Sequence, residues 1–154
     1  MNHLNTIIAL NGFVAVNTDR IEAYRIAEKE VKQKDLKILF ASVAETSIIN
    51  RRDLVIHIEM IGGVVNDYIA IAEFFFQNWI DFKLAISKND TIFLMKLCDV
   101  GERATLDFYE KFLYFPVQFL DEISFQLVKK QFGLLESDRT SALEKLQIIH
   151  NPKK

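Results

Sequence analysis

The sequence is poor in residues that break helices or cross-link chains. It contains two prolines and five glycines, so turns are few and regular elements can be long. Its single cysteine, Cys98, excludes an internal disulfide and a zinc knuckle built from several cysteines. No segment approaches the roughly 20 consecutive apolar residues that a membrane-spanning helix needs. These absences exclude disulfide scaffolds and favour long helices.

An excess of charge of one sign is also missing. The 19 basic and 21 acidic residues leave a net charge of −2, and the basic residues are scattered among acids. No basic face for nucleic acid is therefore expected. The apolar segment over residues 6–16 is preceded by no Lys or Arg, unlike a secretory signal. We expect a cytoplasmic protein with neither nucleic-acid nor membrane partners.

What is present favours a single all-α domain over residues 1–154. Half of the residues are hydrophobic, enough for a sizeable core. Apolar residues recur at spacings of three, four and seven, which predicts four long helices. Asp35 and Asp90 are predicted helix caps, Gly62-Gly63 a helix stop, and Pro116 a first-turn residue. The predicted helices cover residues 3–33, 35–61, 90–115 and 116–149, with a short aromatic helix over residues 73–86.

The connections predict how these helices are ordered. Tight turns join the first helix to the second and the third to the fourth, so each pair should be antiparallel. The link between the second and third helices is long, and one long crossover is the connectivity of a ferritin-like four-helix bundle. Trp79 on this link is expected to be buried against the bundle, because it follows three consecutive Phe residues, Phe74–Phe76.

Two helices carry more apolar surface than one bundle core requires. The fourth has a predicted inner stripe through Leu120, Ile123, Leu127 and Leu134, and a second stripe through Phe125, Val128, Phe132 and Leu135. The second helix has Ile38, Ile49 and Ile56 on its reverse side. The surplus predicts a homodimer with one of these second stripes at its interface.

On the third helix, the small residues Gly101 and Thr105 are expected to let a neighbouring helix approach closely.

Several short strings carry a family resemblance. They are NTDRIEAY at residues 17–24, Gly62-Gly63, Trp79-Ile80-Asp81-Phe82-Lys83, Gly101-Glu102 and Tyr109-Glu110. In order and spacing they resemble an uncharacterised bacterial branch of the ferritin-like superfamily, over about residues 5–115. The resemblance implies a ferritin-like bundle and no established activity. The family's usual His-Asp pair has no clear counterpart in the fourth predicted helix.

The parent fold often carries two iron ions, so we searched for their ligands. A di-iron centre takes Glu-x-x-His from each of two helices, which sets both side chains on one face. Neither His57 nor His150 has a Glu three residues earlier, and nothing precedes His3 at that spacing. The sequence thus predicts no ferritin-type di-iron centre.

A weaker site built from carboxylates stays open. Glu22, Glu45 and Glu102 lie on three different predicted helices. Glu22 and Glu45 fall off the inner stripes and are expected on the solvated face. Glu102 borders the inner face, where the alternatives are a metal ligand and a hydrogen-bonded carboxylate at the edge of the core. We expect the latter and assign no metal residues.

Other polar residues interrupt the inner stripes of the first two helices: Asn17, Ser47, Asn50 and His57. They form either a relic ligand layer or a satisfied polar layer that fixes helix pairing. The second is expected, because an unpaired buried polar group costs about 1–3 kcal/mol. Cys98 is expected to be a small core residue. The charged clusters Asp19-Arg20 and Arg51-Arg52-Asp53 are predicted to form solvated surface pairs.

No catalytic motif is recognisable: there is no Ser-His-Asp order, phosphate-binding Gly loop or Walker-type lysine. We therefore assign no catalytic or cofactor-binding residues and lean away from an enzyme. Three functions stay open. The first is a non-enzymatic interaction or structural protein, the second a divergent metal-binding, iron-handling or metal-dependent oxidoreductase, and the third a carrier of an apolar ligand under the aromatic crossover.

Overall fold

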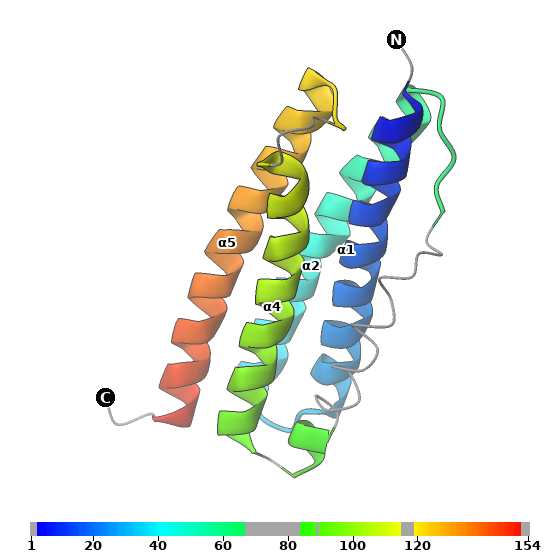
Figure 1. The fold of residues 1–154 in the computed structure, drawn as a ribbon. Coiled ribbons are helices and arrows are strands. Elements are labelled where there is room, and N and C mark those ends of the chain that lie inside the picture. Colours follow the sequence, from blue (N-terminus) through cyan, green and yellow to red (C-terminus); the bar gives the residue numbers. More distant parts are fainter. Residues whose placement is uncertain (1–2, 67–83, 89, 115–118, 152–154) are drawn as a thin grey trace.

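The computed structural model describes residues 3–66, 84–88, 90–114 and 119–151. Within these ranges the chain is helical and contains no strand, which confirms the all-α prediction for this part of the chain. Four long helices stand side by side (Figure 1) and form what we call the bundle: α1 (Leu4–Glu30), α2 (Lys34–Met60), α4 (Thr91–Leu113) and α5 (Glu122–His150).

Each helix of the bundle packs against two others. α1 lies against α2 and α4, and α5 lies against α4 and α2. All neighbouring helices are antiparallel, so α2 and α4 run in the same direction (Figure 1). The chain on either side of residues 67–83 lies at opposite ends of the bundle: Asn66 bonds to Asn11, whereas Ala85 packs with Val31 and Leu36.

The predicted fifth helix falls largely outside the described residues. Residues 84–87 are helical, which agrees with its predicted end near residue 86. Trp79, Phe74–Phe76 and the burial expected for them lie in the range that the structure does not describe.

Local signals explain where α2 ends and α4 begins. Gly62 adopts a φ of 86°, which lets the Gly63 N–H bond to the Ile58 carbonyl at 2.8 Å. The Asp90 side chain accepts a hydrogen bond from the Phe93 N–H at 3.0 Å. Both predictions are confirmed. The prediction for Asp35 is wrong, since α2 begins at Lys34 after Gln33 and Asp35 lies in its first turn.

The start of α5 was also wrongly predicted. The helix begins at Glu122 and not at Pro116, because Asp121 is its N-cap and accepts the Ser124 N–H at 2.8 Å. A side-chain carboxylate that accepts a hydrogen bond from an unpaired N–H of the first turn stabilises a helix start. A proline in the first turn only avoids adding one more unpaired N–H, so it is the weaker signal. Nearby, Phe119 accepts a hydrogen bond from Thr6 of α1 through its carbonyl.

The faces of α5 are reversed relative to the prediction. Val128, Phe132 and Leu135 are buried in the core, whereas Ile123 and Leu134 of the predicted inner stripe are exposed. Leu120 of that stripe is buried as predicted, but it precedes the helix. The two stripes have equal periodicity, so hydrophobic spacing alone could not rank them. The polar residues Ser124 and Gln131 lie on the true inner face, where they form hydrogen bonds, and they made that face look less apolar.

The expected close approach at Gly101 is wrong as well. A Cβ placed on Gly101 would meet nothing within 4 Å. The close approach occurs at Gly12 on α1, where a Cβ would lie 2.8 Å from the Phe108 ring of α4. Phe108 is part of an aromatic cluster around Phe13, whose ring centroid lies 5.2 Å away at an edge-to-face angle.

The core is divided into two apolar clusters. One contains Tyr24, Phe40, Leu94 and Leu146, and the other contains Phe13, Leu54, Tyr109 and Leu135. Between them, at mid-height of all four helices, lie buried polar side chains, which we call the polar belt: Asn17, Arg20, Ser47, Asn50, Glu102, Thr105 and Gln131. None of the described helices is long and apolar enough to cross a membrane.

The reversed faces of α5 can be tested with adjacent leucines. Leu135→Ala removes a side chain with 0% exposure, and we expect it to lower the free energy of unfolding by about 2–5 kcal/mol. Leu134→Ala is the matched control, at 42% exposure, and should change it by less than about 1 kcal/mol. Chemical denaturation measures both. The reverse ranking would contradict this account of α5.

Candidate functional site

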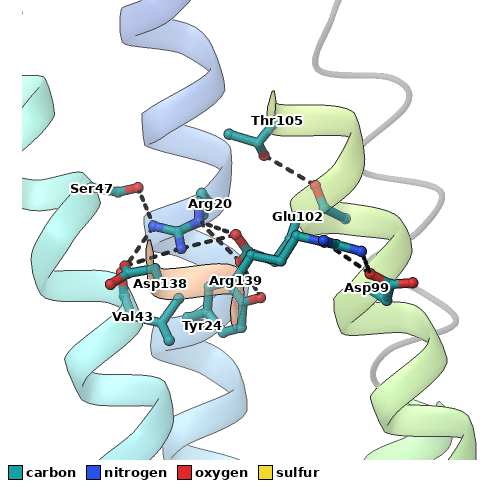
Figure 2. Close-up of polar contacts among 10 residues, drawn as sticks. Arg20, Tyr24, Val43, Ser47, Asp99, Glu102, Thr105, Asp138 and Arg139 are labelled. Atoms are coloured by element: carbon teal, nitrogen blue, oxygen red, sulfur yellow. Dashed lines mark hydrogen bonds and ion pairs between the residues drawn. The ribbon is translucent and has the colours of Figure 1, made fainter. Parts of the chain in front are cut away.

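Arg20 is the centre of the polar belt and contacts all four helices (Figure 2). Its Nε and one terminal nitrogen donate to the two carboxylate oxygens of Glu102 on α4, at 3.1 and 3.0 Å. The other terminal nitrogen donates to Ser47 Oγ and the Val43 carbonyl on α2, at 2.8 and 3.0 Å. Asp138 on α5 accepts a further bond at 3.3 Å. One side chain on α1 thus connects the other three helices.

Tyr24 completes the surroundings of Glu102. Its hydroxyl donates to Glu102 Oε1 at 2.5 Å, and its ring lies beneath the Arg20 guanidinium at 5.5 Å. Burial raises the pKa of Tyr24 well above its usual value, and the neighbouring Glu102 raises it further. The phenol of Tyr24 therefore stays protonated near neutral pH and acts as a hydrogen-bond donor.

The charge state of Arg20 is fixed by its partners. Burial acts to lower the pKa of Arg20, but the negative charges of Glu102 and Asp138 outweigh burial and hold the pKa above its ordinary value. Arg20 is 3% exposed and Glu102 is 2% exposed, and they are the buried ionic side chains among the described residues. Each neutralises the other in a region that water does not reach.

A second hydrogen-bonded chain crosses the bundle one to two helical turns away. Asn17 donates to the Tyr109 hydroxyl at 2.8 Å, and Tyr109 donates to Gln131 Oε1 at 2.8 Å. Gln131 Nε2 in turn donates to the carbonyl of Asn50 at 3.0 Å. This chain also takes one residue from each helix, in the order α1, α4, α5 and α2. Two separate hydrogen-bond networks therefore fix how far each helix is shifted along its axis relative to the other three.

The burial expected for the polar layer is confirmed for three of its four members, Asn17, Ser47 and Asn50. All three are buried, and the side chains of Asn17 and Ser47 form hydrogen bonds, whereas Asn50 contributes its backbone carbonyl. Among the described residues, Asn17 Oδ1 and Asn50 Nδ2 are buried without a hydrogen-bond partner, so the layer is only partly satisfied. His57 is only half-buried and lies apart from the belt, where it shares a 2.7 Å hydrogen bond with Ser124.

The predicted carboxylates separate as expected. Glu22 and Glu45 are exposed on the outer surface, and Glu102 is buried. Glu102 is not left available, because both of its oxygens accept bonds from Arg20. Among the described residues, no group of three His, Cys, Asp or Glu side chains is placed to hold a metal ion.

The prediction that Arg20 forms a surface pair with Asp19 is wrong. Arg20 points inward, because it follows Asn17 by three residues and precedes Tyr24 by four, which places it on the inner face of α1. That spacing was available in the sequence. The other predicted surface cluster fits better, since Arg52 and Asp53 form an exposed ion pair at 3.3 Å.

Gln131 was missed as a belt member, and Tyr109 and Asp138 were missed as hydrogen-bond partners of the belt. Tyr109 was noted only as part of a short family string, and Gln131 and Asp138 lie beyond it on α5. Cys98 is buried beside the belt, which confirms its prediction as a core residue. Burial, reinforced by the charge of Glu102, raises the pKa of the Cys98 thiol, so it is not a reactive thiolate.

Three surface grooves among the described residues lie away from the belt. A surface groove between α1 and α2 is lined by Ile21, Arg25 and Val55, and another between α2 and α5 by Ile38, Lys145 and Ile148. A third lies near the α1–α2 turn and is lined by Leu36, Ala85 and Leu94. None of these grooves is lined by a residue of the belt. The hydrogen bonds of the belt are suited to holding the four helices in register.

The energetic role of the ion pair is testable with a double-mutant cycle. Arg20→Met leaves the Glu102 carboxylate buried without its partner, so we expect a loss of about 3–5 kcal/mol in unfolding free energy. Adding Glu102→Met should recover most of that loss, because no uncompensated charge is left. Denaturant titration of the wild type, both single variants and the double variant gives the coupling.

Arg139 supplies the matched control. It also pairs with a carboxylate of α4, joining α5 to Asp99 at 2.6 Å, but both side chains are partly exposed to water. Arg139→Met should therefore cost less than about 1 kcal/mol. Equal losses for Arg20→Met and Arg139→Met would show that the belt does not carry the stability assigned to it.

Comparison with known proteins adds a family but no activity. No curated protein and no solved structure matches the chain. One family does match, over residues 5–114, a range that contains Arg20, Tyr24, Ser47 and Glu102. Its description names neither a reaction nor a ligand. The chain belongs to the family described as Domain of unknown function (DUF2383).

Proposed function

We propose that this protein is a ferritin-like four-helix bundle with a buried arginine at its centre, the place where the parent fold holds metal ions. We further propose that it is a non-enzymatic interaction protein of the cytoplasm. The ferritin-like assignment is supported by the antiparallel neighbours and the parallel pair α2 and α4, an arrangement that needs one long crossover.

The observation that carries this proposal is the set of oxygens around the Arg20 guanidinium. Glu102, Asp138, Ser47 and the Val43 carbonyl all accept its hydrogen bonds. A metal centre in a bundle core also collects oxygens from facing helices. Here the cation that those oxygens surround is covalently part of α1. Glu102 and Asp138 are thereby neutralised, and a metal ion would have to displace a bidentate arginine to use them.

The non-enzymatic part of the proposal rests on access. A catalytic group must touch its substrate, and the belt residues Arg20, Glu102 and Ser47 are enclosed by the two apolar clusters. Exposed large aliphatic side chains lie instead on the outer helix faces, for example Ile38 and Ile56 on α2. Such side chains suit contacts with another macromolecule.

The other two functions lack a specific observation in their favour. Metal-dependent oxidation is supported by resemblance of fold alone, which is not evidence for a site. The apolar carrier depends on residues 73–86, most of which lie outside the described residues.

Elemental analysis tests the proposal. Protein produced with iron and manganese in the medium and purified without chelators should contain less than about 0.1 equivalent of either metal. Adding either metal should leave the midpoint of thermal unfolding unchanged, because a ligand that binds the folded state raises that midpoint.

A matched pair of variants locates any metal that is found. Glu102→Gln removes a carboxylate from the belt, and Glu45→Gln removes one from the exposed face of α2. One or two equivalents of metal in the wild type, lost in Glu102→Gln and kept in Glu45→Gln, would overturn the proposed function.

A further inference from the structure

We propose that a second copy of this chain docks on the outer face of α2, with the two α2 helices antiparallel about a two-fold axis at Ile49. The proposal rests on the interaction role above and names its partner.

The outer face of α2 carries a regular stripe of exposed residues. The stripe repeats at spacings of four and three, which alternate from Ile38 to Ile56 as in a helix–helix seam and end with a further step of four: Ile38, Ser42, Glu45, Ile49, Arg52, Ile56 and Met60. Every member is exposed in the single chain, with Ile38 at 59%, Ile49 at 36% and Ile56 at 49%. At 1.5 Å per residue the stripe is about 33 Å long.

The sequence contained two surplus apolar stripes, one on α2 and one on α5. In the structure, the stripe on α2 is the exposed one. The competing stripe on α5, through Val128, Phe132 and Leu135, is buried within the chain. The α2 stripe also continues sideways, since Ile38 and Ile148 line one groove between α2 and α5. The apolar surface is therefore wider than a single row of side chains.

The charges within the stripe select a copy of the same helix as its partner. Glu45 lies four residues before Ile49, and Arg52 lies three residues after it. In an antiparallel pair centred on Ile49, Glu45 of one chain and Arg52 of the other differ by about 1.5 Å along the helix axis. A parallel pair in register would set Glu45 against Glu45. The two-fold arrangement thus gives two complementary ion pairs flanking an Ile49–Ile49 contact.

Among the described residues, no strong contact holds the charges of Glu45 and Arg52. Arg52 pairs with its neighbour Asp53 at 3.3 Å, and the Arg52 side chain is 64% exposed. Such a surface pair contributes little to stability, so it can be exchanged for a contact across the interface.

Analytical ultracentrifugation of charge variants tests the proposal. The wild type should sediment as a dimer at high micromolar concentration. Glu45→Arg sets Arg against Arg52, and Arg52→Glu sets Glu against Glu45, so each variant alone should dissociate at least tenfold more readily. An equimolar mixture of the two variants should form a heterodimer, because each then offers the opposite charge. Val100→Asp, an exposed aliphatic position on α4, is the control and should stay dimeric.

Three results would overturn the inference: a monomeric wild type, a dimer that persists in both charge variants, or a mixture that stays monomeric. Circular dichroism of each variant checks that the fold is kept. If the protein is a monomer and contains no metal, the dimer inference fails. The proposed interaction function is then kept, with a partner other than a second copy of the chain. Stoichiometric iron or manganese would overturn the proposed function whatever the assembly.

Discussion

The bidentate ion pair between Arg20 and Glu102 is the interaction on which the rest of the structure depends. Burying either charge alone is prohibitive, so neither helix can pack without the other in register. Because Arg20 also bonds to Ser47 on α2 and Asp138 on α5, a shift of any helix along its axis would break at least one bond to a buried charge. Hydrophobic clusters alone do not penalise such shifts so strongly, since one aliphatic contact can replace another.

The two apolar clusters and the polar belt have different roles in folding. The clusters bring the helices together, because they bury the large aliphatic and aromatic side chains that lie above and below the belt. The belt then selects one alignment from those that the clusters would accept. The chain from Asn17 through Tyr109 and Gln131 to the Asn50 carbonyl repeats the selection one to two turns away. A polar layer of this kind gives specificity at some expense of stability, as single buried polar residues do in coiled coils.

The sequence predicted the helices better than their faces. Strong local signals, such as Gly62-Gly63 and Asp90, marked helix ends correctly because their effect is confined to a few backbone groups. The inner face of α5 was not predictable from spacing, because Leu134 and Leu135 both continue an apolar stripe and only the neighbouring helices decide between them. Arg20 was assigned to the surface because an arginine is buried only when its partners are already in place, and those partners lie on three other helices.

The central claim, that the Arg20 guanidinium is fixed by bonds to the three other helices, is open to direct observation by nitrogen-detected NMR of arginine side chains. In the folded protein, the Nε and terminal N–H groups of Arg20 should give separate signals that exchange slowly with water, because rotation and solvent access are both blocked. The side chain of Arg52, which is exposed, should give an averaged and rapidly exchanging signal under the same conditions. An Arg20 signal that exchanges as fast as that of Arg52 would contradict a closed belt held by this residue.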